Sequence, residues 1–224
     1  MTRLADRFLN RPGNRVAGLF VPAMLLLLAA AMPALAGTEM RLTGDQQVEL
    51  RKINTYLNAL NTMRGRFTQL GPSGEFTEGT FYLQRPGKIR FEYSPPNPIL
   101  VIADGFWVGI EDRKLKDTQK YPLSATPLSL LLEKHVDIGK EARIVGFEEQ
   151  GGDVIVTLEA RSGTTPGQLT LIMGGPNFAL KQWIVIDAQG LKTEVSLFDL
   201  VADVQIEPKL FWINDNMVVK TDYR

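Results

Sequence analysis

Two short segments, residues 78–84 and 88–93, carry apolar side chains at alternate positions. Successive side chains of a β-strand point to opposite faces, so this period predicts two strands that share one apolar face. The turn between them is Arg85-Pro86-Gly87, and by the same period Arg85 falls at the edge of that face. The apolar side chains of the face are Phe81, Leu83, Ile89, Phe91 and Tyr93.

The same alternation, or a short apolar run between turn residues, recurs along the rest of the chain and predicts about ten or eleven strands. Turns such as Asp104-Gly105 are short, so consecutive strands are expected to pair as antiparallel neighbours. Further strands are predicted at residues 66–70, 99–103, 106–110, 115–121, 143–148, 154–160, 169–173, 178–187 and 191–200, with weaker candidates at 204–206 and 210–213.

Two helices are predicted among these strands. The first follows Thr43 or Asp45, either of which can cap it, and its apolar residues recur at intervals of three and four until about residue 61. The second is short and strongly apolar, with Thr126 as its cap and Pro127 in the first helical position. A sheet of so many strands has to curl, split or close, and two helices can lie across the opening of a half-closed one.

The first 36 residues differ in composition from the rest. Four arginines and one aspartate precede an apolar run over residues 16–32, and Ala34-Leu35-Ala36 gives a small-x-small sequence. This pattern predicts a secretory signal peptide, cleaved after Ala36 and followed by a single domain over residues 37–224. The alternative is an uncleaved membrane anchor, for which the run is short because a helical span needs about 20 residues.

Charge and cysteine content narrow the class of protein. Removal of the signal leaves 21 basic and 24 acidic residues, a mild balance that gives no electrostatic case for binding nucleic acid or an anionic membrane. The chain has no cysteine, so it has neither a disulfide nor the acylated cysteine that anchors bacterial lipoproteins. We therefore expect the mature protein to be soluble and not anchored through a lipid.

The residues that would indicate catalysis are sparse. His135 is the only histidine, and the turn at residues 71–74 lacks the strand and helix that flank a nucleophilic serine. The paired acids at residues 111–112 and 148–149 fit solvated turns. Phosphate-binding and dinucleotide-binding glycine patterns are absent from the sequence. We therefore predict no enzymatic activity, no metal and no cofactor.

The apolar side chains are the remaining candidates for a site. Aromatic residues such as Trp107, Trp183 and Phe198 are spread over many strands, and most are expected to pack the core. Arg85 is the exception, because an unpaired buried cation is costly. One hypothesis is that Arg85 donates to the unsatisfied carbonyls at the end of the short helix, as a reversible latch. The alternative is a surface salt bridge to a neighbouring glutamate.

Several short motifs follow one another along the chain: Phe67-Thr68-Gln69, Glu78-Gly79-Thr80-Phe81, Arg85-Pro86-Gly87 with Arg90-Phe91 and Tyr93, Pro95-Pro96, Ala103-Asp104-Gly105 and Thr126-Pro127-Leu128. As an ordered set they resemble the periplasmic outer-membrane lipoprotein carrier family (LolA-like). The resemblance is firm over residues 67–132 and weaker after residue 143. Trp107 and Gly109 depart from it, because that strand of the family is more uniformly apolar and aromatic.

The resemblance implies a mainly β fold: an unclosed antiparallel β-barrel of about 10–11 strands with a helical lid over its concave apolar face. It implies a chaperone in the periplasm of a Gram-negative bacterium, expected to be a monomer, that takes acylated lipoproteins from an inner-membrane ABC transporter and passes them to an outer-membrane receptor. It implies that Arg85 latches the lid. The cavity is expected to be lined by Phe81, Leu83, Ile89, Phe91, Tyr93 and Val101 and covered by Leu128, Leu131 and Leu132.

Two other functions fit the same residues. One is an envelope sensor or structural module with a filled core and no ligand. The other is a carrier of a different lipid, such as a free glycerolipid or a hopanoid, which the sequence does not distinguish from a lipoprotein carrier.

Overall fold

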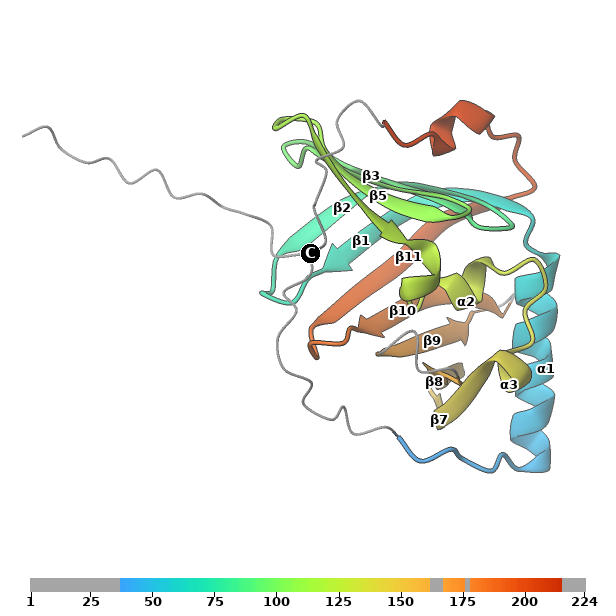
Figure 1. Ribbon diagram of the computed structural model, residues 1–224. Coiled ribbons are helices and arrows are strands. Elements are labelled where there is room, and N and C mark those ends of the chain that lie inside the picture. The colour runs from blue at the N-terminus through green and yellow to red at the C-terminus, as the bar shows by residue number, and fades with distance from the viewer. Residues whose placement is uncertain (1–36, 162–166, 176–177, 215–224) are drawn as a thin grey trace, which may run out of the picture. The chain divides into compact units, whose positions relative to one another are not determined.

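The computed structural model describes residues 37–161, 167–175 and 178–214 (Figure 1). The predicted signal peptide lies outside these residues. Eleven strands form one antiparallel sheet, as predicted. Their bounds are β1 (Thr62–Leu70), β2 (Phe76–Gln84), β3 (Lys88–Tyr93), β4 (Ile99–Asp104), β5 (Trp107–Asp112), β6 (Asp117–Pro122), β7 (Ala142–Gln150), β8 (Asp153–Ala160), β9 (Gln168–Gly174), β10 (Ala179–Ile186) and β11 (Lys192–Ala202).

The sheet is unclosed. Its strand order is β6-β5-β4-β3-β2-β1-β11-β10-β9-β8-β7, so β6 and β7 are its two edges. Consecutive strands pair with each other except β6 and β7, while the first strand also pairs with the last, with Phe67 opposite Leu197. Figure 1 shows the sheet strongly curved, and residues 123–141 connect one edge strand to the other across the concave side. We call residues 123–141 the lid segment.

Helix α1 (Gly44–Ala59) begins as the sequence predicts. Thr43 is its N-cap, and the Thr43 side chain and the Gln46 side chain each bond the backbone of the other, which satisfies two amides that the first turn leaves without partners. Its side chains Ile53 and Leu57 are buried against the sheet. Within the described residues, no helix is long and apolar enough to span a membrane.

The lid segment contains three short helices: η1 (Leu123–Ala125), α2 (Ser129–Leu132) and α3 (Ile138–Glu141). The prediction that Thr126 caps the second helix is wrong. Its hydroxyl instead donates to the Leu123 carbonyl at 2.8 Å, and α2 has no side-chain cap. The predicted strands at 204–206 and 210–213 are also wrong, because this part of the chain is irregular apart from the turn η2 (Pro208–Phe211).

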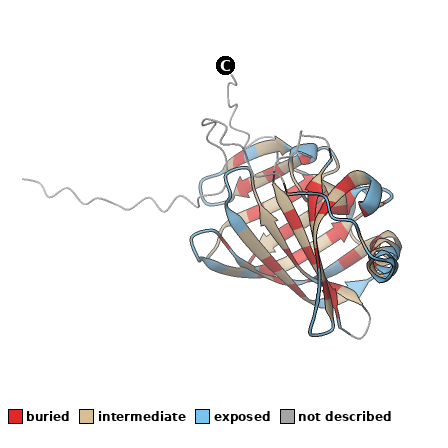
Figure 2. Cartoon of the chain, turned by 90° about the horizontal axis from the view of Figure 1, so that it is seen from below, coloured by how far each residue is buried: buried red, intermediate tan, exposed pale blue. Residues whose placement is uncertain are grey.

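The main core lies on the concave face, where buried residues alternate with less buried ones along the strands (Figure 2). Phe67 is fully buried at its centre. The Phe67 ring meets those of Phe91 and Tyr93 edge-on, with centroids 5.0 Å and 5.1 Å apart. Such edge-to-face contacts add to the free energy of burial and fix the rings relative to one another. The floor beneath the lid segment is therefore rigid.

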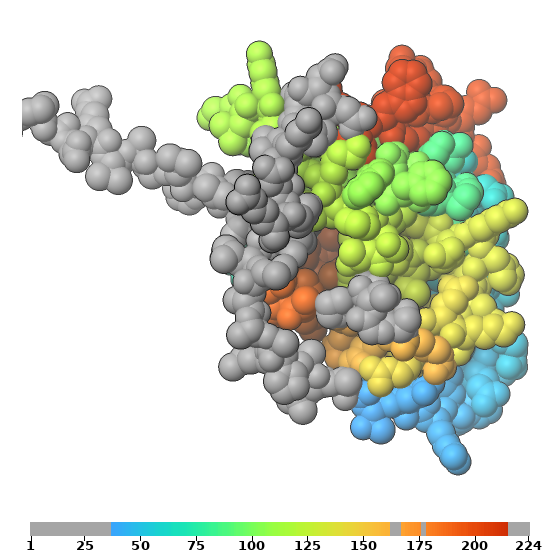
Figure 3. Space-filling model, in the orientation of Figure 1, coloured from blue at the N-terminus to red at the C-terminus, as the bar shows by residue number. Residues whose placement is uncertain are grey.

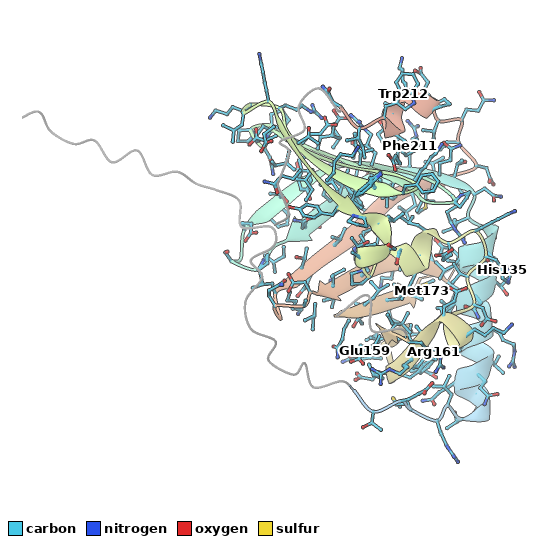
Figure 4. All side chains as sticks on the ribbon, in the orientation of Figure 1. His135, Glu159, Arg161, Met173, Phe211 and Trp212 are labelled. Atoms are coloured by element: carbon cyan, nitrogen blue, oxygen red, sulfur yellow. The ribbon has the colours of Figure 1, made fainter. Side chains whose placement is uncertain are left out.

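A smaller cluster lies on the convex face, where the C-terminal part of the chain folds back over β4 and β5. Phe211 packs on Leu100 and Ile102. Figure 4 shows Trp212 farther from the sheet than Phe211. Two predictions fail on this face. Glu111 is buried and accepts a hydrogen bond from the Asn214 amide at 2.8 Å, so it is not a solvated turn charge. Trp107 is exposed rather than in the core.

Candidate functional site

The concave face and α2 enclose a small apolar cavity of about 20 Å³. This volume holds about one water molecule. Figure 3 shows the lid segment, in yellow-green to yellow, covering the front of the described residues. The cavity is lined by Leu57, Met63, Phe81, Leu83, Arg85, Ile89, Leu128, Leu131, Leu132, Leu180 and Trp183.

The cavity is lined by two thirds of the side chains that the sequence predicts to lie in it. Six of the predicted side chains contribute to it: Phe81, Leu83, Ile89, Leu128, Leu131 and Leu132. The remaining three, Phe91, Tyr93 and Val101, belong to the same apolar core but do not line the cavity. They lie further along the strands, away from the turn that carries Arg85.

Apart from Arg85, which is predicted as the latch, four lining residues are absent from the predicted set, for three different reasons. Met63 lies on the same face of β1 as Phe67, because the two residues are four apart. The prediction misses it because the predicted strand begins at residue 66, whereas β1 begins at residue 62. Leu180 and Trp183 are three residues apart, and they share a face because the register of β10 shifts between Leu180 and Gln182. Alternation alone does not reveal such a bulge. Leu57 comes from α1, whose packing against the cavity has no local signal.

Aromatic contacts hold the wall of the site in place. The Phe91 ring stacks on that of Phe81 and meets the Trp183 indole edge-on, with centroids 6.0 Å and 5.9 Å away. The Tyr93 hydroxyl donates to Gln69 Oε1 at 2.7 Å. Burial raises the pKa of Tyr93 to about 12, against the opposing effect of that hydrogen bond, so the phenol stays neutral. The wall thus carries no charge at neutral pH.

Arg85 joins three elements through backbone carbonyls. From the end of β2 its guanidinium donates from Nε to the Glu133 carbonyl at 3.0 Å and also from Nη2 to the same oxygen. Its Nη1 donates to the Leu57 carbonyl in the last turn of α1. Both acceptors belong to helix ends that leave carbonyls without intrahelical partners. The side chain therefore ties the sheet to α1 and to the end of α2.

Gly87, in the same turn, makes a second connection to α2. Its amide donates to the Leu132 carbonyl at 2.8 Å. Its φ is +77°, a conformation that favours glycine, and a Cβ here would lie 2.6 Å from the Gly105 Cα. Arg85 and Gly87 thus hold two successive carbonyls of the lid segment, while Gly87 packs against the turn between β4 and β5.

The second half of the lid segment is attached to α1 instead. Asn58 donates from Nδ2 to the Val136 carbonyl at 2.8 Å and accepts from the Val136 amide at 2.9 Å. Asn54 Oδ1 accepts from the Ile138 amide at 3.2 Å. The lid segment therefore has two parts with different attachments: α2 is held by the turn at Arg85, and residues 136–138 are held by α1.

The charges near this attachment are mixed. Burial lowers the pKa of Arg85, and the carboxylates of Glu133 and Glu141 oppose that effect, so the guanidinium remains protonated at physiological pH. Burial raises the pKa of Glu141, and the nearby Glu133 and Asp137 carboxylates raise it further, against the effects of a hydrogen bond at Asp137 and of His135. In the described part of the chain, no three acidic or imidazole side chains are grouped to hold a metal ion.

The site is an apolar interior with one charged group, Arg85, at its edge, and hydrogen bonds from the turn at Arg85 hold the lid segment over it. Pockets that enclose drug-sized ligands measure about 300–1,000 Å³, far more than the cavity here. A larger cavity would require α2 to lie farther from the sheet. The contacts of Arg85 and Gly87 with the lid segment are made to the end of α2, whereas those of Asn58 are made to residue 136, beyond α2.

Comparison with known proteins places this site in a family. The model of the family described as "Outer membrane lipoprotein carrier protein LolA" matches residues 58–214. An outer-membrane lipoprotein carrier protein of Pseudomonas paraeruginosa is 27% identical over 197 residues, 84% of this chain and 94% of that protein. Another, from Alkalilimnicola ehrlichii, is 28% identical over 200 residues, 84% of this chain and 86% of that protein.

Among solved structures, a LolA superfamily protein from Nitrosomonas europaea aligns with 73% of this chain and 97% of its own, with a TM-score of 0.41 and 8% identity. The matched family model spans the whole sheet, the lid segment and the last two residues of α1, so it includes every residue that lines the cavity except Leu57. The chain belongs to the outer membrane lipoprotein carrier protein LolA family.

Proposed function

We propose that this protein is a periplasmic chaperone that shields the acyl chains of lipoproteins between the concave face of its sheet and its lid segment. The observation that carries the proposal is the closed apolar cavity whose cover, α2, is held by Arg85 and Gly87 through exchangeable backbone hydrogen bonds. The relatives named as lipoprotein carriers support the same general function.

The energetics suit a carrier that also releases its cargo. Burial of an acyl chain contributes about 0.8 kcal/mol per methylene, of the order of 10 kcal/mol for one chain. Opening the lid costs the packing of Leu131 and Leu132, together with hydrogen bonds worth about 1 kcal/mol each, somewhat more for those to the charged guanidinium. These costs offset part of the gain and keep the cargo transferable.

The route of the cargo extends this proposal. Cleavage after Ala36 would release residues 37–224 into the periplasm. An inner-membrane ABC transporter would supply the lipoprotein, and an outer-membrane receptor would accept it. Phe91, Tyr93 and Val101, which lie beside the closed cavity, would line the enlarged one once α2 has moved.

The test uses the full-length precursor, exported and purified from the periplasm, and a fluorescent triacylated lipopeptide. We expect saturable binding that excess unlabelled lipopeptide displaces. Arg85→Leu should alter loading or transfer, because it removes every donor that holds Glu133. The matched control is Arg113→Leu, since Arg113 is an exposed arginine paired with Glu92, away from the cavity. Equal loading and equal transfer for wild type and Arg85→Leu would refute the latch.

A second candidate is a structural or sensing module whose core is permanently filled. The small volume of the cavity favours it. It predicts that no lipopeptide and no hydrophobic dye binds at any concentration below that which unfolds the chain. A third candidate, a carrier of another lipid, predicts that mass spectrometry of the protein purified from periplasm finds a free lipid instead of an acylated polypeptide.

A further inference from the structure

The turn between β4 and β5 presents the most exposed large apolar side chain of the described residues. Phe106 is 80% exposed, and Trp107, next to it, is 44% exposed. The Asp104 carboxylate fixes the turn, because its Oδ1 accepts from both the Phe106 and the Trp107 amides at 2.8 Å. The two aromatic residues are therefore held at the tip of a rigid hairpin.

This turn contacts the lid segment at its first residue and, through Gly87, at the end of α2. The Phe106 carbonyl accepts from the Leu123 amide at 2.9 Å, where the lid segment begins. On its other side Gly105 lies against Gly87, whose amide holds Leu132 at the end of α2. Phe106 thus bonds the start of the lid segment directly, and its neighbour Gly105 lies against the residue that holds the end of α2.

Two lysines lie near this turn, one of them over the Trp107 ring. Lys120 Nζ lies 5.8 Å from the centre of the Trp107 ring, and Lys88 Nζ lies 5.9 Å from that of Phe211 on the same convex face. Lys88 is directly opposite Asp104 in the sheet register. Aromatic residues flanked by lysines suit the boundary between lipid headgroups and acyl chains, where rings are partly buried and ammonium groups meet anionic phosphates.

We propose that the Phe106–Trp107 turn is a membrane-contact element that inserts into the headgroup region of an anionic phospholipid bilayer and so brings the lid to the membrane. The inference rests on the proposed carrier function, because a carrier of acyl chains needs its opening near a bilayer. A bilayer suits the turn better than a protein partner does, because the exposed rings lie at a hairpin tip with a lysine over one of them.

Phe76 provides a matched control within the same chain. It is 66% exposed and also lies at a hairpin end, opposite Leu70. Its sequence neighbours include Glu75 and, two residues further on, Glu78. These acids would be repelled by anionic lipid, whereas the turn at Phe106 has Lys88 and Lys120 near the single carboxylate of Asp104, so exposure is similar at the two positions while the nearby charge differs.

The experiment uses Phe106→Cys and Phe76→Cys in the full chain, each labelled with an environment-sensitive fluorophore. The natural chain has no cysteine, so each label is unique. With cargo-free protein and vesicles of phosphatidylethanolamine and phosphatidylglycerol, we expect a blue shift at position 106 and none at position 76. In co-sedimentation, Phe106→Ser with Trp107→Ser should weaken vesicle binding about tenfold, and Phe76→Ser should leave it unchanged.

Three results would overturn the proposal. One is a label at position 106 that stays unchanged in lipid vesicles. Another is a response that requires vesicles containing membrane proteins, which would make the turn a protein contact. The third is a response that depends on protein concentration without lipid, which would make it an interface between copies. Uptake of lipopeptide in solution without vesicles tests the carrier function separately, so the two failures are distinguishable.

Discussion

Asn58 and Val136 form a reciprocal pair in which one side-chain amide satisfies both backbone groups of a buried residue. The two distances are 2.8 Å and 2.9 Å, and Val136 is only 2% exposed. The pair joins α1 to the middle of the lid segment. It therefore separates the part that stays with α1 from the part that Arg85 holds.

We predict that Asn58→Ala lowers the free energy of unfolding by about 1–3 kcal/mol for each backbone group of Val136 left unpaired. Asn54→Ala removes the acceptor of a single amide, that of Ile138, and should cost roughly half as much. Urea unfolding monitored by tryptophan fluorescence measures both. Equal losses in the two variants would show that the reciprocal pair has no special contribution.

Gly87→Ala should destabilise the protein more than Gly74→Ala. Both residues have positive φ, +77° and +82°, so alanine is strained at either position by about 1–2 kcal/mol. At Gly74 a Cβ meets nothing within 4 Å, whereas at Gly87 it would lie 2.6 Å from Gly105. Hydrogen exchange of the Gly87 amide should also accelerate, since its bond to Leu132 weakens. Similar midpoints in urea for the two variants would contradict this account.

Leu132→Ala and Leu171→Ala are predicted to differ although both side chains are buried, at 2% and 0% exposure. Leu171 lies in the middle of β9, an inner strand of the sheet, and its truncation should cost about 2–5 kcal/mol of global stability. Leu132 lies in a cover that can separate from the sheet, so its truncation should cost less globally and increase binding of a hydrophobic dye under native conditions. The opposite order would mean that the lid unfolds only together with the sheet.

Glu141→Gln should stabilise the protein at neutral pH but not under acid conditions. Burial raises the pKa of Glu141, and among the described residues nothing donates a hydrogen bond to its buried Oε2. A carboxyl whose pKa is raised by folding binds its proton more tightly in the native state than in the unfolded state. The contribution of Glu141 to the free energy of unfolding therefore falls as the pH rises above 4.5, its ordinary pKa. Glu133 remains near Arg85 in the variant.

The difference in melting temperature between Glu141→Gln and wild type should therefore be close to zero below pH 4.5 and grow toward neutral pH. Thermal unfolding followed by circular dichroism over that range measures it. Glu39→Gln is a suitable control, because Glu39 is an exposed acid paired with Arg161. A constant difference across the range would mean that the ionisation of Glu141 does not affect stability.

The sequence predicts the concave face of β2 and β3 well, because both strands alternate without interruption. The sequence does not predict that Leu180 and Trp183 of β10 both line the cavity, since a bulge between Leu180 and Gln182 shifts the alternation of side chains by one residue. The sequence pattern places Trp107 in the core because alternation separates the two faces of β5 but does not tell which of them is the concave, buried one. Glu111 is buried only because Asn214, 103 residues later, returns to it. Such long-range contacts have no local signal.

The helical cover is predicted only in part for a related reason. Leu131 and Leu132 are evidently apolar, but the capping pattern at Thr126 competes with a turn in which the hydroxyl bonds back to Leu123. The four residues of α3 are too few to show a helical period. The contact of Arg85, by contrast, is predicted correctly. A cation on an apolar face needs acceptors, which indicates the helix end whose carbonyl it contacts. Its function as a latch stays a prediction.

The lid segment is also the only covalent link between the two edge strands that follow each other in sequence, Pro122 in β6 and Ala142 in β7. Its contour length therefore limits how far the two edges can separate. Helical residues advance about 1.5 Å each and extended ones about 3.3 Å, so unwinding the four residues of α2 would lengthen the link by about 7 Å. Unwinding of α2 and separation of the two edges are thus coupled through the lid segment, and shortening that segment would reduce the largest separation that the edges can reach.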